Sequence, residues 1–291
     1  MKKQKVNKGY HDYFKNKDLV NNYFEIGRLL VEAQGGEERA KYGNGLFKEW
    51  SIELTEKYGK GYNSSNLKRF RQFYMYFKKG APVAHQLTWS HYCELLPLED
   101  INEINYYIQM TIEQCLSKRQ LRERIKTKEY QRLDENTKLK LINKEELDIK
   151  DNIKNPIVIH NKNNLDKENI SEKILKNLIL EDLDNFLLEL GEGFTYIRNE
   201  YKIKIGSTYN YIDLLLFNYI YNCFIVIELK VTELKKEHIG QIQIYMNYVD
   251  KNIKTINQDK TIGVIICKKD NGYYIEYSSD KRIFSKNYIL S

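Results

Sequence analysis

Two carboxylates and one lysine interrupt apolar runs in the last third of the sequence. Asp213 lies within YIDLLLF, and Glu228 and Lys230 lie within VIELK. A charge in an apolar segment is unfavourable unless it is paired or binds a metal ion. Carboxylate oxygens hold Mg²⁺ or Mn²⁺, and such an ion polarises a phosphate and lowers the pKa of an attacking water. The spacing D-x14-E-x-K therefore predicts metal-dependent phosphodiester hydrolysis, with Asp213 and Glu228 as ligands and Lys230 orienting the water.

The surrounding pattern predicts that neighbouring strands carry these residues. Runs rich in β-branched and aromatic residues mark three strands: 194–205, 209–217 and 223–230. Apolar periodicity predicts two helices and one further strand around them: 171–190, 236–250 and 261–267. The order αβββαβ is typical of an α/β sandwich around one mixed sheet.

Alternation along a strand decides which side chains can meet. Glu228 and Lys230 are two residues apart, so they share one face, and a neighbouring strand can bring Asp213 beside them. The competing interpretation is that the three charges only protect edge strands from aggregation. Their spacing across adjacent apolar strands favours a catalytic site over protection of edge strands.

The basic charge is concentrated in the first half of the chain. Residues 1–133 hold 24 Lys+Arg against 16 Asp+Glu, a net charge of +8, whereas residues 134–291 hold 23 against 24, a net charge of −1. A basic half suits a polyanion, because phosphate contacts supply most of the sequence-independent affinity for nucleic acid. A solvated lysine-rich surface would give the same count.

A helix, a glycine-containing turn and a capped basic helix follow one another at 45–77, the outline of a helix-turn-helix. The apolar residues of NLKRFRQFYMYF form one stripe, and the remaining positions offer candidate nucleic-acid contacts: Lys68, Arg69, Arg71 and Gln72. A further helical run at 101–128 adds two more candidates, Arg119 and Arg122. Ordinary surface helices also carry such residues.

Composition divides the chain into a helical, mostly basic domain at 1–133, a linker at 134–170 rich in Lys, Asp and Asn, and a catalytic domain at 171–291. The apolar runs LKLI and IVI inside the linker suggest a helix or strand docked on a neighbour. No apolar run is long enough to span a membrane, and the N-terminus lacks the apolar region of a secretion signal, so a cytoplasmic protein is expected.

Other chemistries find no support. The cysteines lie far apart without CxxC spacing, so neither a zinc site nor a disulfide framework is indicated. No P-loop or GxGxxG motif is present, so ATP and NAD are not expected as cofactors. His91, in LTWSHY, is interpreted as a capping group and not as a catalyst.

The order of helix, strand, D-strand, ExK-strand and helix resembles the PD-(D/E)XK nuclease core. Two further features are similar to elements of this superfamily. Glu181, 12 residues before Gly193, resembles the helix acid that several members direct at the metal, and Asp182 and Glu189 are neighbouring acids that could take this role instead. Gln241 with Tyr245 resembles the Q-x-x-x-Y element of many members, which implies that Gln241 positions substrate or Lys230. The proline of the motif is Ile212 here, a change that many members tolerate.

The resemblance extends over nearly the whole chain. EIGRLLVEAQGGEERAKYGNGLFKEW, LTWSHY, FLLELGEGF and GQIQIYMNYVD look like the bacterial and phage YhcG-like family. It implies a winged-helix-like, DNA-binding first half, and only loosely a role in restriction, mobile elements or phage conflict. We therefore expect an α+β, two-domain, Mg²⁺- or Mn²⁺-dependent DNA endonuclease.

Two alternatives stay open: a DNA-binding or assembly protein whose nuclease-like domain does not cleave, and a toxin or defence nuclease acting on RNA. The intact Asp, Glu-x-Lys and Gln set argues against the first. A homo-oligomer would pair two helix-turn-helix units on a palindromic site, but one sequence does not settle the oligomeric state.

Overall fold

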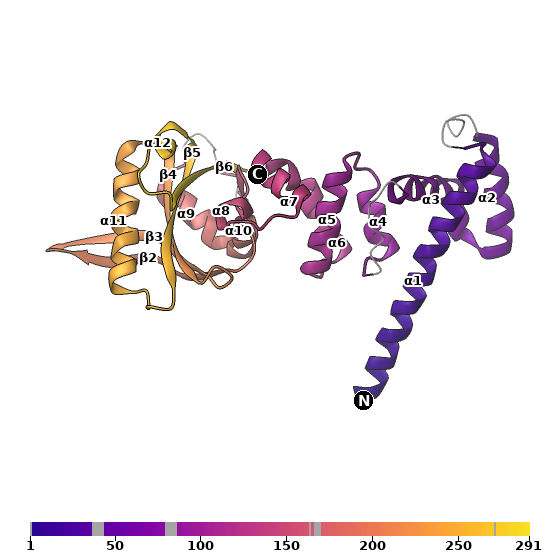
Figure 1. The fold of residues 1–291 in the computed structure, drawn as a ribbon, viewed down its shortest axis with the longest axis horizontal. Coiled ribbons are helices and arrows are strands. Elements are labelled where there is room, and N and C mark those ends of the chain that lie inside the picture. The colour runs from indigo at the N-terminus through magenta and orange to yellow at the C-terminus, as the bar shows by residue number, and fades with distance from the viewer. Residues whose placement is uncertain (1, 37–43, 79–85, 163, 166–169, 271) are drawn as a thin grey trace. The chain divides into compact units, whose positions relative to one another are not determined.

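The chain divides into two units between Tyr130 and Gln131 (Figure 1). The computed structural model describes residues 2–36, 44–78, 86–162, 164–165, 170–270 and 272–291. Unit 1 is Met1–Tyr130 and unit 2 is Gln131–Ser291. No helix in these described ranges is both long and apolar enough to cross a membrane.

Unit 1 is built from helices. They are α1 (Lys2–Ala33), α2 (Asn44–Tyr58), η1 (Lys60–Tyr62), α3 (Ser64–Phe77), α4 (Trp89–Leu95), α5 (Ile101–Glu113) and α6 (Lys118–Lys126). Asn63 caps α3 by accepting a hydrogen bond from the Asn66 N–H. Phe70 of α3 is fully buried, and its ring stacks on Tyr23 of α1 at 4.1 Å between centroids.

The expected winged-helix-like architecture is not confirmed. Helix α2, the short turn η1 and helix α3 do follow one another as the sequence predicts. The described residues of unit 1 contain no strand, however, and a wing is a β-hairpin. The expected capping role of His91 agrees with the structure, because its Nδ1 lies 3.1 Å from the Thr88 backbone nitrogen at the start of α4.

Two predicted helices are each broken in two. The run at 101–128 forms α5 and α6, because Ser117 and Gln120 make a capping box that starts a new helix. The run at 171–190 forms α9 (Glu172–Glu181) and α10 (Leu183–Leu190). Asp182 separates them with a non-helical backbone, and its carboxylate accepts hydrogen bonds from the Asn185 amide.

The described residues of unit 2 surround one six-stranded mixed sheet. Its strands are β1 (Ile157–Ile159), β2 (Phe194–Ile205), β3 (Thr208–Asn218), β4 (Cys223–Glu233), β5 (Asp259–Lys269) and β6 (Ile283–Leu290), in the order β1-β6-β5-β4-β3-β2. Strands β2, β3 and β4 are antiparallel, and β4, β5, β6 and β1 are parallel. The remaining elements are η2 (Tyr130–Arg132), which begins at the unit boundary, α7 (Glu135–Asn143), α8 (Ile149–Asn152), α11 (Lys236–Asn252) and α12 (Gly272–Glu276).

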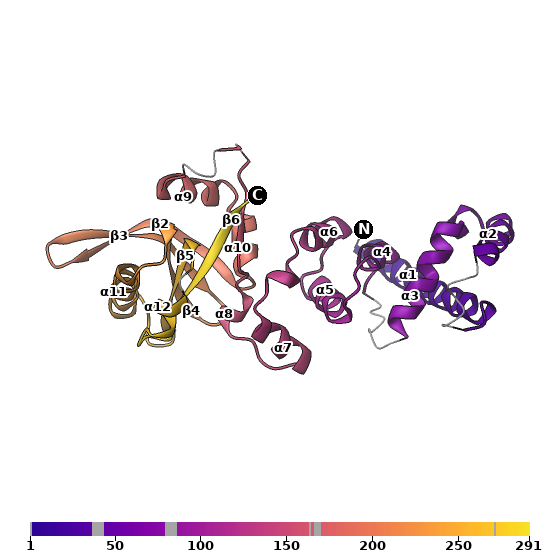
Figure 2. The ribbon, with the colours of Figure 1, turned by 90° about the horizontal axis from the view of Figure 1, so that it is seen from above.

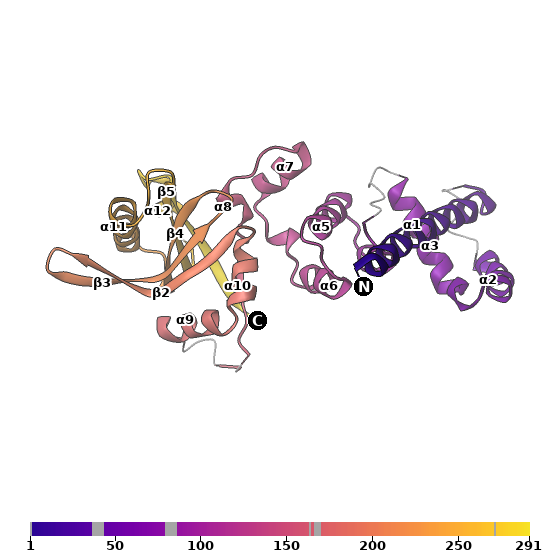
Figure 3. The same ribbon diagram turned by 90° about the horizontal axis from the view of Figure 1, so that it is seen from below.

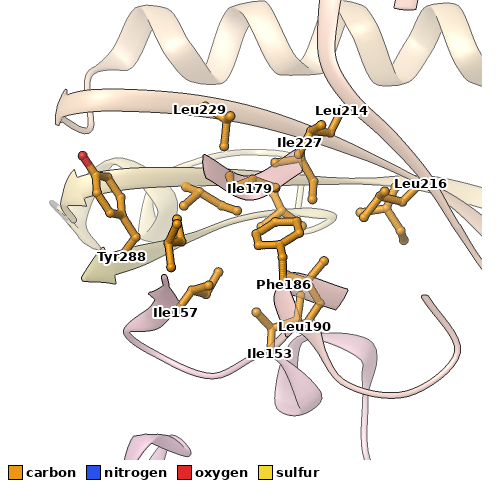
Figure 4. Packing of buried hydrophobic residues seen from close by; sticks show 14 of the residues in the cluster. Ile153, Ile157, Ile179, Phe186, Leu190, Leu214, Leu216, Ile227, Leu229 and Tyr288 are labelled. Carbon is orange, nitrogen blue, oxygen red and sulfur yellow. The ribbon is translucent and has the colours of Figure 1, made fainter. Parts of the chain in front are cut away.

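Helices cover both faces of this sheet (Figure 2). On one face, Ile179, Phe186 and Leu190 of α9 and α10 pack against alternate residues of β3 and β4, including Leu214 and Ile227 (Figure 4). On the other face, α11 packs against the remaining apolar residues of the same strands. The predicted order of helix, three strands, helix and strand is present, with β6 and β1 extending the sheet.

The segment 134–170, predicted as a linker, lies within unit 2. Its IVI run forms β1, which pairs in parallel with β6 at the edge of the sheet. Arg132 and Glu189 form a buried ion pair, and the Glu189 carboxylate also accepts the Val158 N–H at 2.9 Å. The polar residues of the segment 134–170 occupy exposed positions between these buried contacts. A count of residue types does not distinguish such a docked segment from a linker.

Candidate active site

Strand β3 separates from β4 at Asp213. The two strands pair from Asn218↔Cys223 to Leu214↔Ile227, and Asp213 follows the last pair. Its Oδ2 accepts the Leu229 N–H at 3.0 Å, so a carboxylate takes the place of a strand as the partner of β4. The carboxylate is thereby held where the two strands diverge, and we call this place the fork.

Glu228 and Lys230 lie on β4 at the fork. Lys230 Nζ donates to Glu228 Oε1 at 2.9 Å. Gln241, on α11, donates from Nε2 to the same oxygen at 2.8 Å and lies 3.1 Å from the Tyr245 hydroxyl. The structure therefore brings Asp213, Glu228, Lys230 and Gln241 together. Gln241 contacts the glutamate, whereas the sequence left open a contact with the lysine or with substrate.

The environment of Glu228 disfavours its charge. The side chain is 3% exposed, and Oε2 is buried without a hydrogen-bond partner in the described part of the chain. Burial, with the negative charge of Asp213 added, raises the pKa of Glu228 to about 7, although Lys230 opposes the shift. Burial lowers the pKa of Lys230, but Glu228 and Glu172 outweigh it and the net shift is upward.

Helix α9 contributes two side chains that sequence reasoning missed. Lys176 Nζ lies 2.8 Å from Glu200 Oε1 and 3.4 Å from Asp213 Oδ1, and its side chain is 12% exposed. Glu172, four residues earlier and so on the same helical face, lies 3.6 Å from Lys230 Nζ. The i, i+4 spacing of Glu172 and Lys176 was a usable signal, because it places an acid and a base on one face of the helix.

Glu200 has an unusual backbone. Its φ is 46°, in the left-handed region that a glutamate rarely adopts. The register of β2 and β3 places it opposite Asp213, at a position where no pair forms. The Glu200 carboxylate lies 2.8 Å from Lys176 Nζ at this irregular position. Backbone strain of this kind is concentrated at functional sites.

Glu181 does not take the place that the sequence assigned to it. It is the last residue of α9 and is exposed, about 13 Å along the helix axis from Glu172. Two neighbouring acids also have other partners, because Asp182 binds His160 and Glu189 binds Arg132. The acid of α9 that lies at the fork is Glu172. Which residues of α9 reach the fork depends on how the helix packs against the sheet, and the sequence alone does not determine that packing.

The residues at the fork fit a hard divalent cation. Asp213 and Glu228 are carboxylates close enough for one to raise the pKa of the other, and Glu228 Oε2 has no hydrogen-bond partner among the described residues. Within the described ranges, no three acidic, His or Cys side chains converge as a ready metal site. Asp213 and Glu228 are the two carboxylates that could hold such an ion, and Lys176 and Lys230 pair with them in this structure.

Both parts of the chain match known family models. Residues 150–290 match the YhcG PDDEXK nuclease domain, and residues 5–132 match the DUF1016 N-terminal domain. The chain belongs to the YhcG-like PD-(D/E)XK nuclease family. The family expected from the sequence is thus confirmed. A relative from Escherichia coli (strain K12), named "Putative nuclease YhcG", is 26% identical over 299 residues, which cover 89% of this chain and 79% of the relative.

Two solved structures are similar to a smaller part of this family member. They are a repair endonuclease from Pyrococcus abyssi and the structure titled "Structure of EndoMS-dsDNA2 complex". Each is 18% identical with a TM-score of 0.30 and covers 42% of this chain. The match spans 47% and 44% of those chains, which is less than half of either.

The candidate nucleic-acid contacts on α3 differ in their surroundings. Lys68 and Arg69 are exposed. Arg71 is half-buried, and its Nε has no hydrogen-bond partner in the described residues. Gln72 donates to the Leu96 carbonyl at 2.7 Å, so it joins two segments of unit 1. Lys68 and Arg69 remain the best placed of the four.

The two candidates on α6 also differ. Arg119 is exposed. Arg122 is paired with Glu94 through two hydrogen bonds of 2.9 and 2.8 Å, and Lys118 lies 3.4 Å from the same carboxylate. Arg122 would have to leave a bidentate partner to bind a phosphate.

Proposed function

We propose that this family member is a metal-dependent DNA endonuclease with its active site at the fork. The observation that carries the proposal is the convergence of Asp213, Glu228 and Lys230 where β3 leaves β4. Mg²⁺ or Mn²⁺ is the expected ion, because both prefer oxygen ligands. The basic charge of residues 1–133 supports nucleic acid as the partner.

Each side chain then has a definite task. Asp213 and Glu228 hold the ion, which when bound polarises the phosphate and lowers the pKa of the attacking water. Lys230 orients that water and offsets the charge that develops on the phosphate. Gln241 holds Glu228 Oε1, which leaves Oε2 for the ion. Glu172 replaces Glu181 as the acid of α9 that assists the site.

Cleavage of supercoiled plasmid, linear duplex DNA and structured RNA, with Mg²⁺ or Mn²⁺ and with EDTA, tests the proposal. We expect DNA cleavage to need the metal and to fall about 10³-fold or more in Asp213→Ala, Glu228→Ala and Lys230→Ala. Glu233→Ala is the matched control, since Glu233 is an exposed carboxylate on the same strand.

Other outcomes separate the alternatives. Metal-dependent cutting of RNA alone would replace DNA as the substrate. DNA binding without cleavage under any metal would support a binding or assembly protein. Equal activity in Glu228→Ala and Glu233→Ala would place the active site elsewhere.

A further inference from the structure

The outer part of the β2–β3 hairpin is a two-stranded ribbon that leaves the sheet beyond the fork. We call residues 201–212 the arm. Its strands pair from Tyr201↔Ile212 to Ile205↔Thr208, and the turn between them uses Gly206 at φ 61°. Strand β4 pairs with β3 only from Leu214 onward, so the arm lacks that neighbour. Figures 1 and 3 show it projecting past α11.

The two faces of the arm are chemically different. The inner face carries Ile203 and Ile212, which are buried in the cluster formed with α11. The outer face carries two cross-strand pairs, Lys202↔Tyr211 and Lys204↔Tyr209. All four of these side chains are exposed, the tyrosines by 52–53%. The inner face anchors the arm, so the outer face is presented in a fixed orientation.

The outer face is positively charged and has no acidic residue. Residues 201–212, YKIKIGSTYNYI, contain two lysines and neither Asp nor Glu. Lys202 Nζ lies 3.9 Å from the centroid of the Tyr209 ring, a cation–π contact that leaves the ammonium available to a phosphate. The buried lysines of the fork, in contrast, already have carboxylate partners.

This face continues into the active site. The register that pairs Lys202 with Tyr211 brings Glu200 opposite Asp213 two residues further along, and Lys176 contacts both carboxylates there. The rise of a strand puts the two lysine–tyrosine pairs about 7 and 13 Å from Asp213 along the ribbon. A nucleic acid with its scissile phosphate at the fork would therefore extend along the arm.

We propose that the arm binds duplex DNA next to the scissile phosphate, with Lys202 and Lys204 on the sugar-phosphate backbone. The inference rests on the proposed function and adds the surface that positions the substrate. A two-stranded ribbon fits the major groove, which is about 12 Å wide. Lys202 covers one face of the Tyr209 ring, which makes the ring a poor platform for stacking an unpaired base.

Salt-dependent binding of the full chain tests the arm. A fluorescent duplex is titrated in EDTA, which prevents cleavage, at several NaCl concentrations. The logarithm of the association constant falls as the logarithm of the salt concentration rises, and the double variant Lys202→Gln/Lys204→Gln should make this slope shallower by about 1.8. Its binding should be roughly 60-fold weaker at 0.1 M salt. The substitutions leave the net charge of +8 on residues 1–133 unchanged.

The matched control is Lys251→Gln/Lys281→Gln. Both lysines are exposed and lie near the starts of the parallel strands, at the end opposite the fork. Lys251 is in the last turn of α11, and Lys281 precedes β6. Their loss should leave the salt slope unchanged. Circular dichroism of both double variants shows whether each folds as the wild type does.

Three results would overturn the proposal: an unchanged slope in the folded arm variant, an equal change in the control, or a loss confined to single-stranded DNA or RNA. Cleavage adds an independent readout, since the KM of the arm variant should rise more than its kcat falls. Absence of cleavage in every variant would count against the proposed function alone, because the binding assay contains no metal.

Discussion

Replacing Glu228 by glutamine should stabilise the metal-free protein while it abolishes metal binding. The carboxylate is buried, and its Oε2 lacks a partner among the described residues. Burial and the charge of Asp213 raise the pKa of Glu228 to about 7 from an ordinary value of 4.5. Glutamine keeps the shape and an oxygen for the Lys230 and Gln241 contacts, but removes the unfavourable charge.

The size of the effect follows from linkage. A carboxyl group whose pKa is higher in the folded state than in the unfolded state contributes its full stabilisation of the folded state below the unfolded-state pKa. This contribution is lost as the pH rises through the folded-state pKa. The shift from 4.5 to about 7 corresponds to about 3 kcal/mol of unfolding free energy lost between about pH 4 and pH 8. Glu228→Gln should recover about that amount at pH 8 and almost nothing at pH 4.

Thermal unfolding followed by circular dichroism in EDTA measures this difference. For a unit of the size of unit 2, about 3 kcal/mol raises the midpoint by about 6–12 °C. Glu233→Gln is the control, because Glu233 is exposed and its ion pair with Lys269 lies on the surface. A lower midpoint at pH 8, or a gain that does not depend on pH, would refute the reasoning.

Metal addition completes the test. An ion that binds only the folded state adds about 2.7 kcal/mol at a hundred times its Kd. Mg²⁺ or Mn²⁺ should therefore raise the midpoint of the wild type and leave that of Glu228→Gln unchanged. An equal rise in both would show that the ion binds away from this carboxylate.

Three further changes address single contacts. Lys176→Met should tighten Mn²⁺ binding in calorimetry by roughly tenfold, because the ammonium 3.4 Å from Asp213 opposes the ion; weaker binding would contradict this. Arg132→Ala should lower the unfolding free energy in urea by about 3–5 kcal/mol, since it leaves Glu189 buried without its ion-pair partner; a loss below 1 kcal/mol would contradict it. Gln241→Leu should reduce cleavage with little loss of stability, and unchanged cleavage would show that its contact with the metal-binding carboxylate is dispensable.

The sequence by itself determined the residues whose identity depends on local pattern. Asp213, Glu228 and Lys230 stand out because each interrupts an apolar strand, and alternation along β4 places Glu228 and Lys230 on one face. Gln241 followed from resemblance to the family, and the structure places it 2.8 Å from Glu228. The inference for Asp213, Glu228 and Lys230 needed only the period of a strand and the order of elements.

Only the tertiary structure decided which residues of other segments reach the fork. Glu172 and Lys176 lie there and Glu181 does not, because the rotation of α9 depends on its packing against β4. The arm likewise exists because β3 pairs with β4 only from Leu214 onward, which the sequence pattern does not indicate. Sequence periodicity describes one element at a time, whereas these positions depend on contacts between elements far apart in the chain.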